Sequence, residues 1–362
     1  MFGVNSFFQK RRNQWISCPK SSHYLHYRSW KGTRNAWDKS GVARYTQLQE
    51  NDIQEIIRNY NLVVVGFAPI EGGASNSSYL LHTQQGKHVL TVFDDKTLAY
   101  VVSLGQLLLL LAEYEFPTTR LLVPIQGNIA IVHRGKPVMV KAYIPGQVYT
   151  DLDTTMLLQA GAAMARLHQI PAPDFLPCKH SYGRQVFPTV IGRDIDPVYE
   201  SWLAERCAYL NQCIPPELPI GLIHGDLFYD NVLFKRKNFR AIIDFEEACH
   251  YYKAFDIGMG ILGLCAEGTT VALDKAQALV AGYQQVRLLE ESEKETLQLF
   301  IEYAAIATSY WRFWKYHIHT PMVEKADKHW QMVRLAQEIN AKPQTRFLEA
   351  VFNDRARTSN RE

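Results

Sequence analysis

Residues 221–234 read GLIHGDLFYDNVLF, and they place four polar side chains between two apolar runs. The polar residues are His224, Asp226, Asp230 and Asn231. The flanks GLIH and NVLF are short and rich in β-formers, so the segment predicts a loop held between packed strands. Loops on a rigid scaffold are common positions for catalytic groups. This loop is therefore the leading candidate for a functional site.

A further carboxylate follows this loop across a predicted hairpin. The segments NVLF and AIIDF are joined by the turn KRKNFR, which can bring Asp244 to the end of the strands that carries Asp226 and Asn231. Two carboxylates and an amide oxygen are hard ligands. Such ligands suit Mg2+, which accepts one or two carboxylates and fills its remaining positions with phosphate oxygens and water.

The chain of 362 residues exceeds what one compact core usually holds, so we expect two lobes. Residues 44–142 contain a short amphipathic helical pattern, several strand patterns and a longer helix through residues 99–114. After a Pro-Gly linker, residues 143–345 are mostly helical in pattern. The expected fold class is α+β, with a small antiparallel-sheet N-terminal lobe and a larger, mainly helical C-terminal lobe.

The two ends of the chain differ from its body. Residues 1–43 are basic and contain no acidic residue before Asp38. This composition predicts an extension that is disordered or belongs to a mis-assigned start, with an organelle transit peptide as the alternative. Residues 346–362 are expected to form a C-terminal tail.

Composition excludes several classes of partner. The formal net charge is only +3, and much of the basic excess lies in the first segment, so no general nucleic-acid footprint is predicted. The longest apolar run, near residues 104–112, is too short to span a bilayer. Six cysteines lack metal-binding spacing, so we expect free thiols in a reducing cytoplasm. Nothing in the sequence specifies an oligomeric state.

Several segments together resemble a known family. The HGD motif at residues 224–226, with Asn231 and then Asp244, resembles the catalytic loop and metal-binding aspartate of protein-kinase-like phosphotransferases. The form is that of the aminoglycoside phosphotransferase and choline kinase superfamily. Within it, HVLTVFD, HGDLFYDNVLF and IIDFEEAC resemble segments of the homoserine kinases of that type. The resemblance covers roughly residues 44–340.

This resemblance implies a bilobal kinase-like fold and an ATP-dependent enzyme. Its acceptor would be the hydroxyl group of a small molecule, homoserine, and its product O-phosphohomoserine, a threonine precursor. By position, Asp226 would orient the acceptor hydroxyl and can deprotonate it, while Asn231 and Asp244 would hold Mg2+. His224 would brace the loop, and Asp256 would tie it to a following helix.

The same resemblance assigns further residues to the ligands. The candidate ATP contacts are Gly72, Gly73, Ser75, Asn76 and Ser77 in the turn EGGASNS, and Ala142, Tyr143 and Ile144 in the interlobe hinge. In that turn, glycines let backbone amides approach phosphate, although an ordinary hairpin turn has the same composition. Arg312, whose planar fork suits a carboxylate, and Tyr229 are the candidate acceptor contacts.

The sequence departs from the kinase pattern on the third strand. Thr91 stands where protein kinases carry a phosphate-binding lysine, and Lys87 and Lys96 are the nearby candidate substitutes. Two alternatives therefore stay open. One is a kinase for another acceptor, such as an amino alcohol, a sugar, an aminoglycoside or a protein serine or threonine. The other is a nucleotide-binding pseudokinase.

Overall fold

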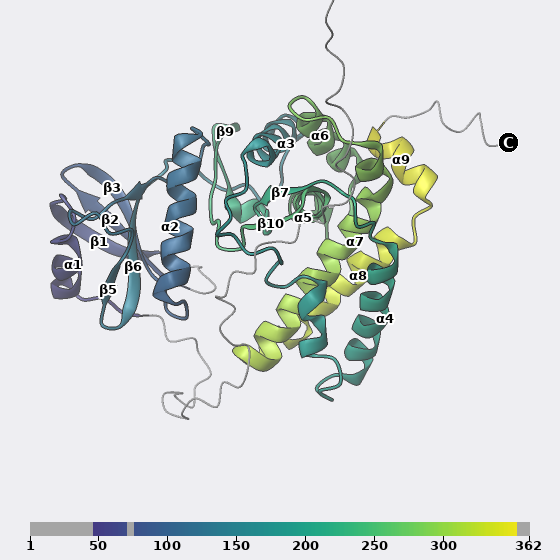
Figure 1. Cartoon of the computed structure of the whole chain (residues 1–362), viewed down its shortest axis with the longest axis horizontal. Helices are drawn as coiled ribbons and strands as arrows, with labels where there is room; N and C mark the ends of the chain where they lie inside the picture. Colours follow the sequence, from purple (N-terminus) through teal and green to yellow (C-terminus); the bar gives the residue numbers. More distant parts are fainter. Residues whose placement is uncertain (1–45, 71–75, 353–362) are drawn as a thin grey trace, which may run out of the picture. The chain divides into compact units, whose positions relative to one another are not determined.

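The structure is a computed structural model, and it describes residues 46–70 and 76–352 (Figure 1). These residues belong to one compact unit. The predicted extension at residues 1–43 lies outside the described ranges, and so do Gly72, Gly73 and Ser75 of the glycine-rich turn.

The first part of the described chain forms an antiparallel sheet with two helices. Its elements are α1 (Glu50–Ile57), β1 (Val64–Ile70), β2 (Ser77–Thr83), β3 (Gly86–Val92), α2 (Leu98–Glu113), β4 (Leu121–Leu122), β5 (Ile131–His133) and β6 (Lys136–Ala142). The strand order is β1-β2-β3-β6-β4, and β5 also pairs with β6. Every pairing in this sheet is antiparallel, which confirms the predicted sheet lobe.

Alternation along β3 and β6 decides which side chains face the rest of the molecule. Leu90 and Val140 pack with α1 in one apolar cluster. Phe93 and Met139 instead belong to the large cluster that contains α2 and the helical region. Because successive side chains of a strand point to opposite faces, Lys141 lies on the same face as Met139.

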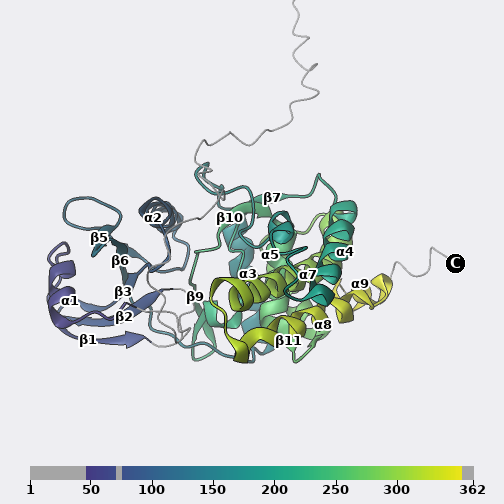
Figure 2. The ribbon, with the colours of Figure 1, turned by 90° about the horizontal axis from the view of Figure 1, so that it is seen from below.

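The second part is mainly helical, as predicted. Its longer elements are α3 (Thr154–Gln169), α4 (Pro197–Cys213), α5 (Lys253–Cys265), α6 (Leu273–Gln284), α7 (Glu291–Phe313), α8 (His329–Asn340) and α9 (Gln344–Phe352). Its short strands are β7 (Ile220–Ile223), β8 (Val232–Lys235), β9 (Asn238–Ile242), β10 (Cys249–Tyr252), β11 (Ala266–Glu267) and β12 (Thr270–Val271). Helix α3 packs on α6, and α5 and α8 pack on α7 (Figures 1 and 2).

Helix α5 is the buried centre of the helical part, and it packs against the backbone of the polar loop. Nearly all of its residues are buried, in keeping with the apolar sequence KAFDIGMGILGLC. Gly263 lies so close to the loop that a Cβ atom there would be 2.3 Å from the backbone oxygen of Leu227. A residue without a side chain is therefore required where α5 passes under the loop.

The C-terminal tail predicted at residues 346–362 begins inside a helix. Helix α9 continues to Phe352, and it contacts α6 and α7. Phe347 and Val351 are buried because they lie four residues apart, on one face of α9. The boundary was therefore placed too early, since a nine-residue amphipathic helix gives only a short periodic signal.

The described cysteines are not all free thiols. Cys207, Cys213, Cys249 and Cys265 are free thiols. Cys178 is disulfide-bonded, so the prediction of free thiols is wrong at this position.

Within residues 46–70 and 76–352, no helix is long and apolar enough to cross a membrane.

Candidate active site

The polar loop begins where β7 ends, and His224 braces it. The His224 Nε2–H group donates to the backbone oxygen of Ile243 at 2.9 Å, and the Asp226 amide donates to His224 Nδ1 at 3.2 Å. A carbonyl only accepts and an amide only donates, so the imidazole is neutral with its proton on Nε2. The ring thus joins the loop to the segment that carries Asp244.

Asp256 fixes the loop from α5. It is fully buried, and its carboxylate accepts from the backbone amides of His224 at 3.0 Å and Gly225 at 2.7 Å. Burial alone would raise the pKa of Asp256, but the hydrogen bonds from His168 and from the Gly225 amide hold it below its usual range. The carboxylate is therefore ionised, and its charge strengthens the bonds that hold the loop.

A buried chain of hydrogen bonds extends behind Asp256. His168 Nε2 donates to Asp256 at 2.9 Å, and the hydroxyl group of Tyr283 donates to His168 Nδ1 at 2.7 Å. Arg287 in turn donates to that hydroxyl and pairs with Glu293. Burial lowers the pKa of His168, so the Asp256 carboxylate is paired with a neutral imidazole. These residues link α3, α5 and α7 to the loop.

Gly225 adopts a conformation that only glycine tolerates here. Its φ angle is 83°, and an added Cβ atom would be 2.6 Å from the backbone oxygen of Glu247. The imidazole of His180, which donates from Nε2 to the Gly225 carbonyl at 3.0 Å, would be 2.8 Å from that Cβ atom. The Gly at the centre of HGD is thus required both by backbone conformation and by space.

Asp226 extends from this turn and is held by Tyr182. The Tyr182 hydroxyl group donates to Asp226 Oδ1 at 2.7 Å. Burial raises the pKa of Asp226 to about 7, and the negative charges of Glu247 and Asp244 add to the rise while the Tyr182 bond opposes it. A carboxyl group that titrates near neutrality is suited to accept a proton from a hydroxyl group.

Asn231 and Asp244 lie next to one another beside Asp226. Asn231 Nδ2 donates to the backbone oxygen of Asp226 at 2.8 Å, which leaves its side-chain oxygen free to face a ligand. The Ile243 amide donates to the Asn231 carbonyl at 2.9 Å, and this pairs the two segments. The structure therefore brings together the three residues that the sequence predicted as one site.

This donor set fits Mg2+ in its nucleotide-bound form. Asp244 is exposed, and its backbone adopts the left-handed conformation with a φ angle of 65°. Its carboxylate therefore projects from a tight turn. Within the described ranges, no group of three or more histidine, cysteine, aspartate or glutamate side chains could hold a metal ion. One carboxylate and one amide oxygen are the sparse protein contribution that Mg2+ accepts when phosphates and water complete its shell.

Glu246 connects the sheet region to this site. The Asn76 side chain donates to Glu246 Oε1, and the Tyr100 hydroxyl group donates to the Glu246 carbonyl. Burial raises the pKa of Glu246 to about 7, together with Asp244, whereas Lys96 and Lys141 lower it. Two lysines from the sheet region therefore direct positive charge towards the segment after Asp244, and sequence reasoning had identified only Lys96.

Two other predicted phosphate contacts, Asn76 and Ser77, differ in whether their polar side-chain atoms are already bound. Asn76 lies at the site, and its Oδ1 atom is buried without a hydrogen-bond partner among the described atoms. The Ser77 hydroxyl group instead donates to Asp94 at 2.6 Å and accepts from the Thr46 amide at 2.7 Å. These contacts do not favour the predicted phosphate contact of Ser77, because they already occupy its hydroxyl group.

The backbone amides of the three hinge residues also differ in whether they already donate a hydrogen bond. The Ala142 amide donates to the Arg120 carbonyl at 2.8 Å, and the Tyr143 amide donates to the Lys87 carbonyl at 3.1 Å. No hydrogen bond from the Ile144 amide is found among the described residues. Of the three predicted hinge contacts, Ile144 therefore has the backbone donor that remains available to a ligand.

Thr91 lies in β3, the third strand of the sheet. Thr91 is buried, and its hydroxyl group lies 3.4 Å from that of Ser78. The ammonium group of Lys87 lies 5.7 Å from the centre of the Tyr143 ring, beside the hinge. Lys141 is opposite Val89 of β3, on the face of the sheet that Thr91 shares.

The two predicted acceptor contacts lie in different places. Tyr229 belongs to the short helix η2 (Tyr229–Asn231) in the loop itself and is exposed. Arg312 Nη1 donates to the Lys328 carbonyl at 3.1 Å and to Gln331 Oε1 at 2.9 Å. The guanidinium of Arg312 is thus bound to the start of α8, which does not favour its predicted role.

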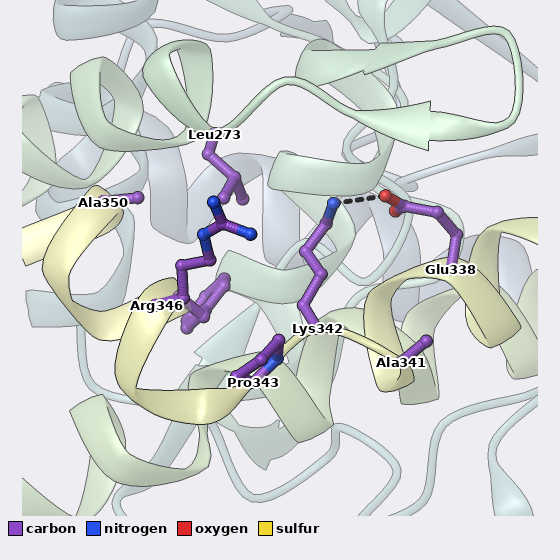
Figure 3. A pocket seen from close by; sticks show the side chains of 8 residues that line it. Leu273, Glu338, Ala341, Lys342, Pro343, Arg346 and Ala350 are labelled. Carbon is purple, nitrogen blue, oxygen red and sulfur yellow. Dashed lines mark ion pairs between the residues drawn. The ribbon is translucent and has the colours of Figure 1, made fainter.

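A surface pocket at α8 and α9 is separate from these residues. Its lining comprises Leu273, Glu338, Ala341, Lys342, Pro343, Arg346, Phe347 and Ala350 (Figure 3). An ion pair between Lys342 and Glu338 lies across it. None of the predicted site residues lines this pocket, so it takes no part in the site described above.

Comparison with known proteins decides the family. The model of the phosphotransferase enzyme family matches residues 66–289. The chain belongs to this phosphotransferase family. The match includes the sheet, the hinge and the loop at residues 221–234, so the family assignment rests on the same segments as the site geometry.

Curated relatives share much of the chain. A homoserine kinase of Phenylobacterium zucineum is 30% identical over 277 residues, which are 73% of this chain and 85% of that protein. A homoserine kinase of Caulobacter vibrioides is 28% identical over 280 residues, covering 73% of this chain and 87% of that protein. The resemblance to this group of family members is thus borne out.

Solved structures confirm the kinase-like fold. Amicoumacin kinase in complex with AMP-PNP, Ca2+ and Ami has a TM-score of 0.63 at 16% identity, over 81% of this chain and 93% of that chain. A microcompartment-associated aminopropanol kinase has a TM-score of 0.61 at 17% identity, over 83% and 98% of the two chains. At these identities the likeness shows the fold alone.

Proposed function

We propose that the protein is a homoserine kinase that transfers the γ-phosphoryl group of ATP to the side-chain hydroxyl group of homoserine. The observation that carries the reaction class is the joint geometry of Asp226, Asn231 and Asp244, in a member of the phosphotransferase family. The acceptor is supported by the homoserine kinases that share 73% of the chain. The product is O-phosphohomoserine.

In this proposal Asp226 receives the acceptor hydroxyl. Tyr182 fixes one carboxylate oxygen, and the pKa near 7 lets the carboxyl accept the proton as the oxygen attacks phosphorus. His224 and Asp256 act through the loop and position Asp226 rather than react. Phosphoryl transfer depends mainly on positioning and charge neutralisation, so this small set of residues suffices.

Asn231 and Asp244 would hold Mg2+ in this proposal. When bound, the ion neutralises charge on the ATP phosphates. Ile144 would donate its backbone amide to the adenine, while Asn76 would act at the phosphates from the edge of β2. Ser77 is assigned no contact, because its hydroxyl group is bound to Asp94, whereas Gly72, Gly73 and Ser75 stay predicted phosphate contacts.

The acceptor is tested by Mg2+-dependent ADP release from ATP. The panel contains homoserine, choline, ethanolamine, hydroxylysine, methylthioribose and an aminoglycoside. We expect homoserine to give the highest kcat/KM. A rate with homoserine no higher than the acceptor-free background would refute this acceptor. ATP binding without turnover on any of these compounds would instead support the pseudokinase alternative that Thr91 motivates.

Lys141 is expected to supply the phosphate-binding charge that Thr91 lacks. It lies on the same sheet face as Thr91, and its charge acts on Glu246 at the site. Loss of one charge-assisted contact should lower kcat/KM for ATP by about 10- to 100-fold in Lys141→Met. Lys87→Met is the matched comparison, since Lys87 lies beside the hinge. A larger loss in Lys87→Met than in Lys141→Met would show that Lys87 is the lysine that binds the phosphates.

Activity is expected to rise with pH through the neutral range. Because burial raises the pKa of Asp226 to about 7, its carboxylate becomes available as a base only near that pH. We expect kcat/KM for the acceptor to rise by roughly tenfold per pH unit below about pH 6 and to level off above about pH 8. A flat profile from about pH 5.5 to 8.5 would contradict the assignment of Asp226 as base.

A further inference from the structure

Lys315 is buried without a counter-ion. Only 8% of its surface is exposed, yet no hydrogen bond or ion pair of its ammonium group is found among the described residues. Its ammonium nitrogen is not among the described side-chain atoms that are both fully buried and without a partner, so the stem of the side chain is packed while the charged end reaches solvent. The ammonium group of Lys315 is therefore open to an anionic ligand.

The surroundings of Lys315 carry an excess of positive charge. Burial lowers the pKa of Lys315, Asp95 opposes this as the strongest single charge, and Lys96 and Lys325 add to the lowering. We call Lys96, Lys315 and Lys325 the lysine cluster. Burial and the charge of Lys315 also lower the pKa of the neighbouring His319. The local field thus favours an anion over a cationic ligand.

The lysine cluster is connected to the candidate active site through Tyr100. The ammonium group of Lys96 lies 4.6 Å from the centre of the Tyr100 ring, a cation–π contact. The hydroxyl group of the same tyrosine donates to the Glu246 carbonyl, two residues after Asp244. Lys96 also lowers the pKa of Glu246. The cluster therefore borders the segment that follows the metal-binding position.

The cluster lies at the end of β3 that is remote from the hinge. His88 of β3 is opposite Ala142, and Val92 is opposite Val138, so β3 runs away from the hinge towards Asp95. Four residue steps along a strand cover about 13 Å. An ATP molecule whose adenine lies at the hinge would direct its phosphates and the acceptor towards this end.

The local backbone at Lys315 is unusual and separates it from Arg312. Residues Trp314–His319 form a π-helical turn, η3, directly after α7. Such turns are rare and occur often at functional sites. Arg312 is bound to the start of α8, whereas Lys315, three residues later, is turned inward. Lys315, in the π-helical turn, thus takes the place of the predicted Arg312 as the candidate cation for the acceptor carboxylate.

We propose that Lys315, with Lys96 beside it, binds the carboxylate group of the acceptor. An ammonium–carboxylate pair would supply the counter-ion that the buried lysine lacks, through charge-assisted hydrogen bonds. An amino alcohol without a carboxylate would leave Lys315 unpaired and would add a second cation. The inference rests on the proposed kinase function and narrows its acceptor to a hydroxy compound that bears an anionic group.

The test compares two acceptors that differ only in the carboxylate, homoserine and 3-aminopropan-1-ol. Lys315→Met should lower kcat/KM for homoserine by about 10- to 100-fold, the worth of one charge-assisted contact. It should leave KM for ATP and the rate with 3-aminopropan-1-ol within about twofold. Lys315→Arg should recover part of the homoserine activity. Lys328→Met, an exposed lysine of η4 (Val323–Lys328), is the matched control and should behave as the wild type.

Three results with the Lys315→Met variant would overturn the inference. The first is an unchanged kcat/KM for homoserine, and the second is an equal loss with both acceptors. The third is a loss that appears as a higher KM for ATP, which would assign Lys315 to the phosphates. Failure of the homoserine assignment can be distinguished from failure of the role proposed for Lys315. If the wild type instead phosphorylates another hydroxy acid better than its decarboxylated analogue, and Lys315→Met removes that preference, Lys315 still binds the carboxylate. Preference for acceptors without an anionic group refutes the inference.

Discussion

Replacing Asp226 by asparagine is expected to lower kcat by about 100- to 10,000-fold, the usual contribution of a general base. Asparagine keeps the size of the side chain and can still contact the Tyr182 hydroxyl, but it cannot take the proton of the acceptor. Asn231 bonds to the backbone oxygen of Asp226, which the substitution leaves in place. Affinity for MgATP should therefore stay within about threefold, as measured by titration of the full chain.

The control for this variant is Asp230→Asn. Asp230 is an exposed acid in the same loop, and its side chain accepts a hydrogen bond from its own backbone amide rather than from another segment of the described structure. Its replacement should change kcat by less than about threefold. Retention of more than a tenth of wild-type kcat in Asp226→Asn would contradict the role assigned to Asp226, whatever the result for Asp230.

The same substitution separates function from stability. The usual pKa of an aspartate is 3.8, whereas burial raises that of Asp226 to about 7 in the folded protein. Between these values the folded state binds more protons than the unfolded state, so the unfolding free energy falls as pH rises. Without nucleotide and metal, Asp226→Asn should therefore have a higher Tm than the wild type at pH 8 and a similar Tm at pH 4.

Local patterns were sufficient to predict much of the fold and the centre of the site. Strand patterns around HVLTVF and PVMVKAY, and helical periodicity in residues 154–169, each depend on neighbours in sequence. The spacing from Asp226 to Asn231 and on to Asp244 is also local, because one hairpin joins them. For that reason the three residues could be predicted together, and the structure brings them together.

Partners that arrive from distant segments could not be predicted in the same way. Tyr182 contacts Asp226 across 44 residues, and His168 contacts Asp256 across 88. Neither lies in a motif, and a histidine or tyrosine in a helix or loop is usually read as core packing. The burial of Lys315 could not be predicted for a related reason: it lies in the π-helical turn after α7, which has no clear sequence signature, and Arg312 has the more conspicuous side chain for a carboxylate.

Asp244→Asn is expected to have the second large effect, a loss of at least about a hundredfold in kcat/KM for MgATP. A ligand that neutralises charge through a metal is worth several kcal/mol, and asparagine keeps the shape but removes the charge. Asparagine also tolerates the left-handed backbone at this position, where φ is 65°. The variant should therefore fold normally, with a Tm close to that of the wild type.

The dependence on Mg2+ distinguishes metal binding from other roles of Asp244. At a fixed ATP concentration, Asp244→Asn should need a higher Mg2+ concentration to reach half of its own maximal rate, because one of the two proposed protein ligands has lost its charge. Glu247→Gln is the matched control, since Glu247 contributes to the same negative field but follows the turn and contacts Ser181. An unchanged Mg2+ requirement in Asp244→Asn, with a lowered kcat, would assign this residue to loop geometry rather than to the metal.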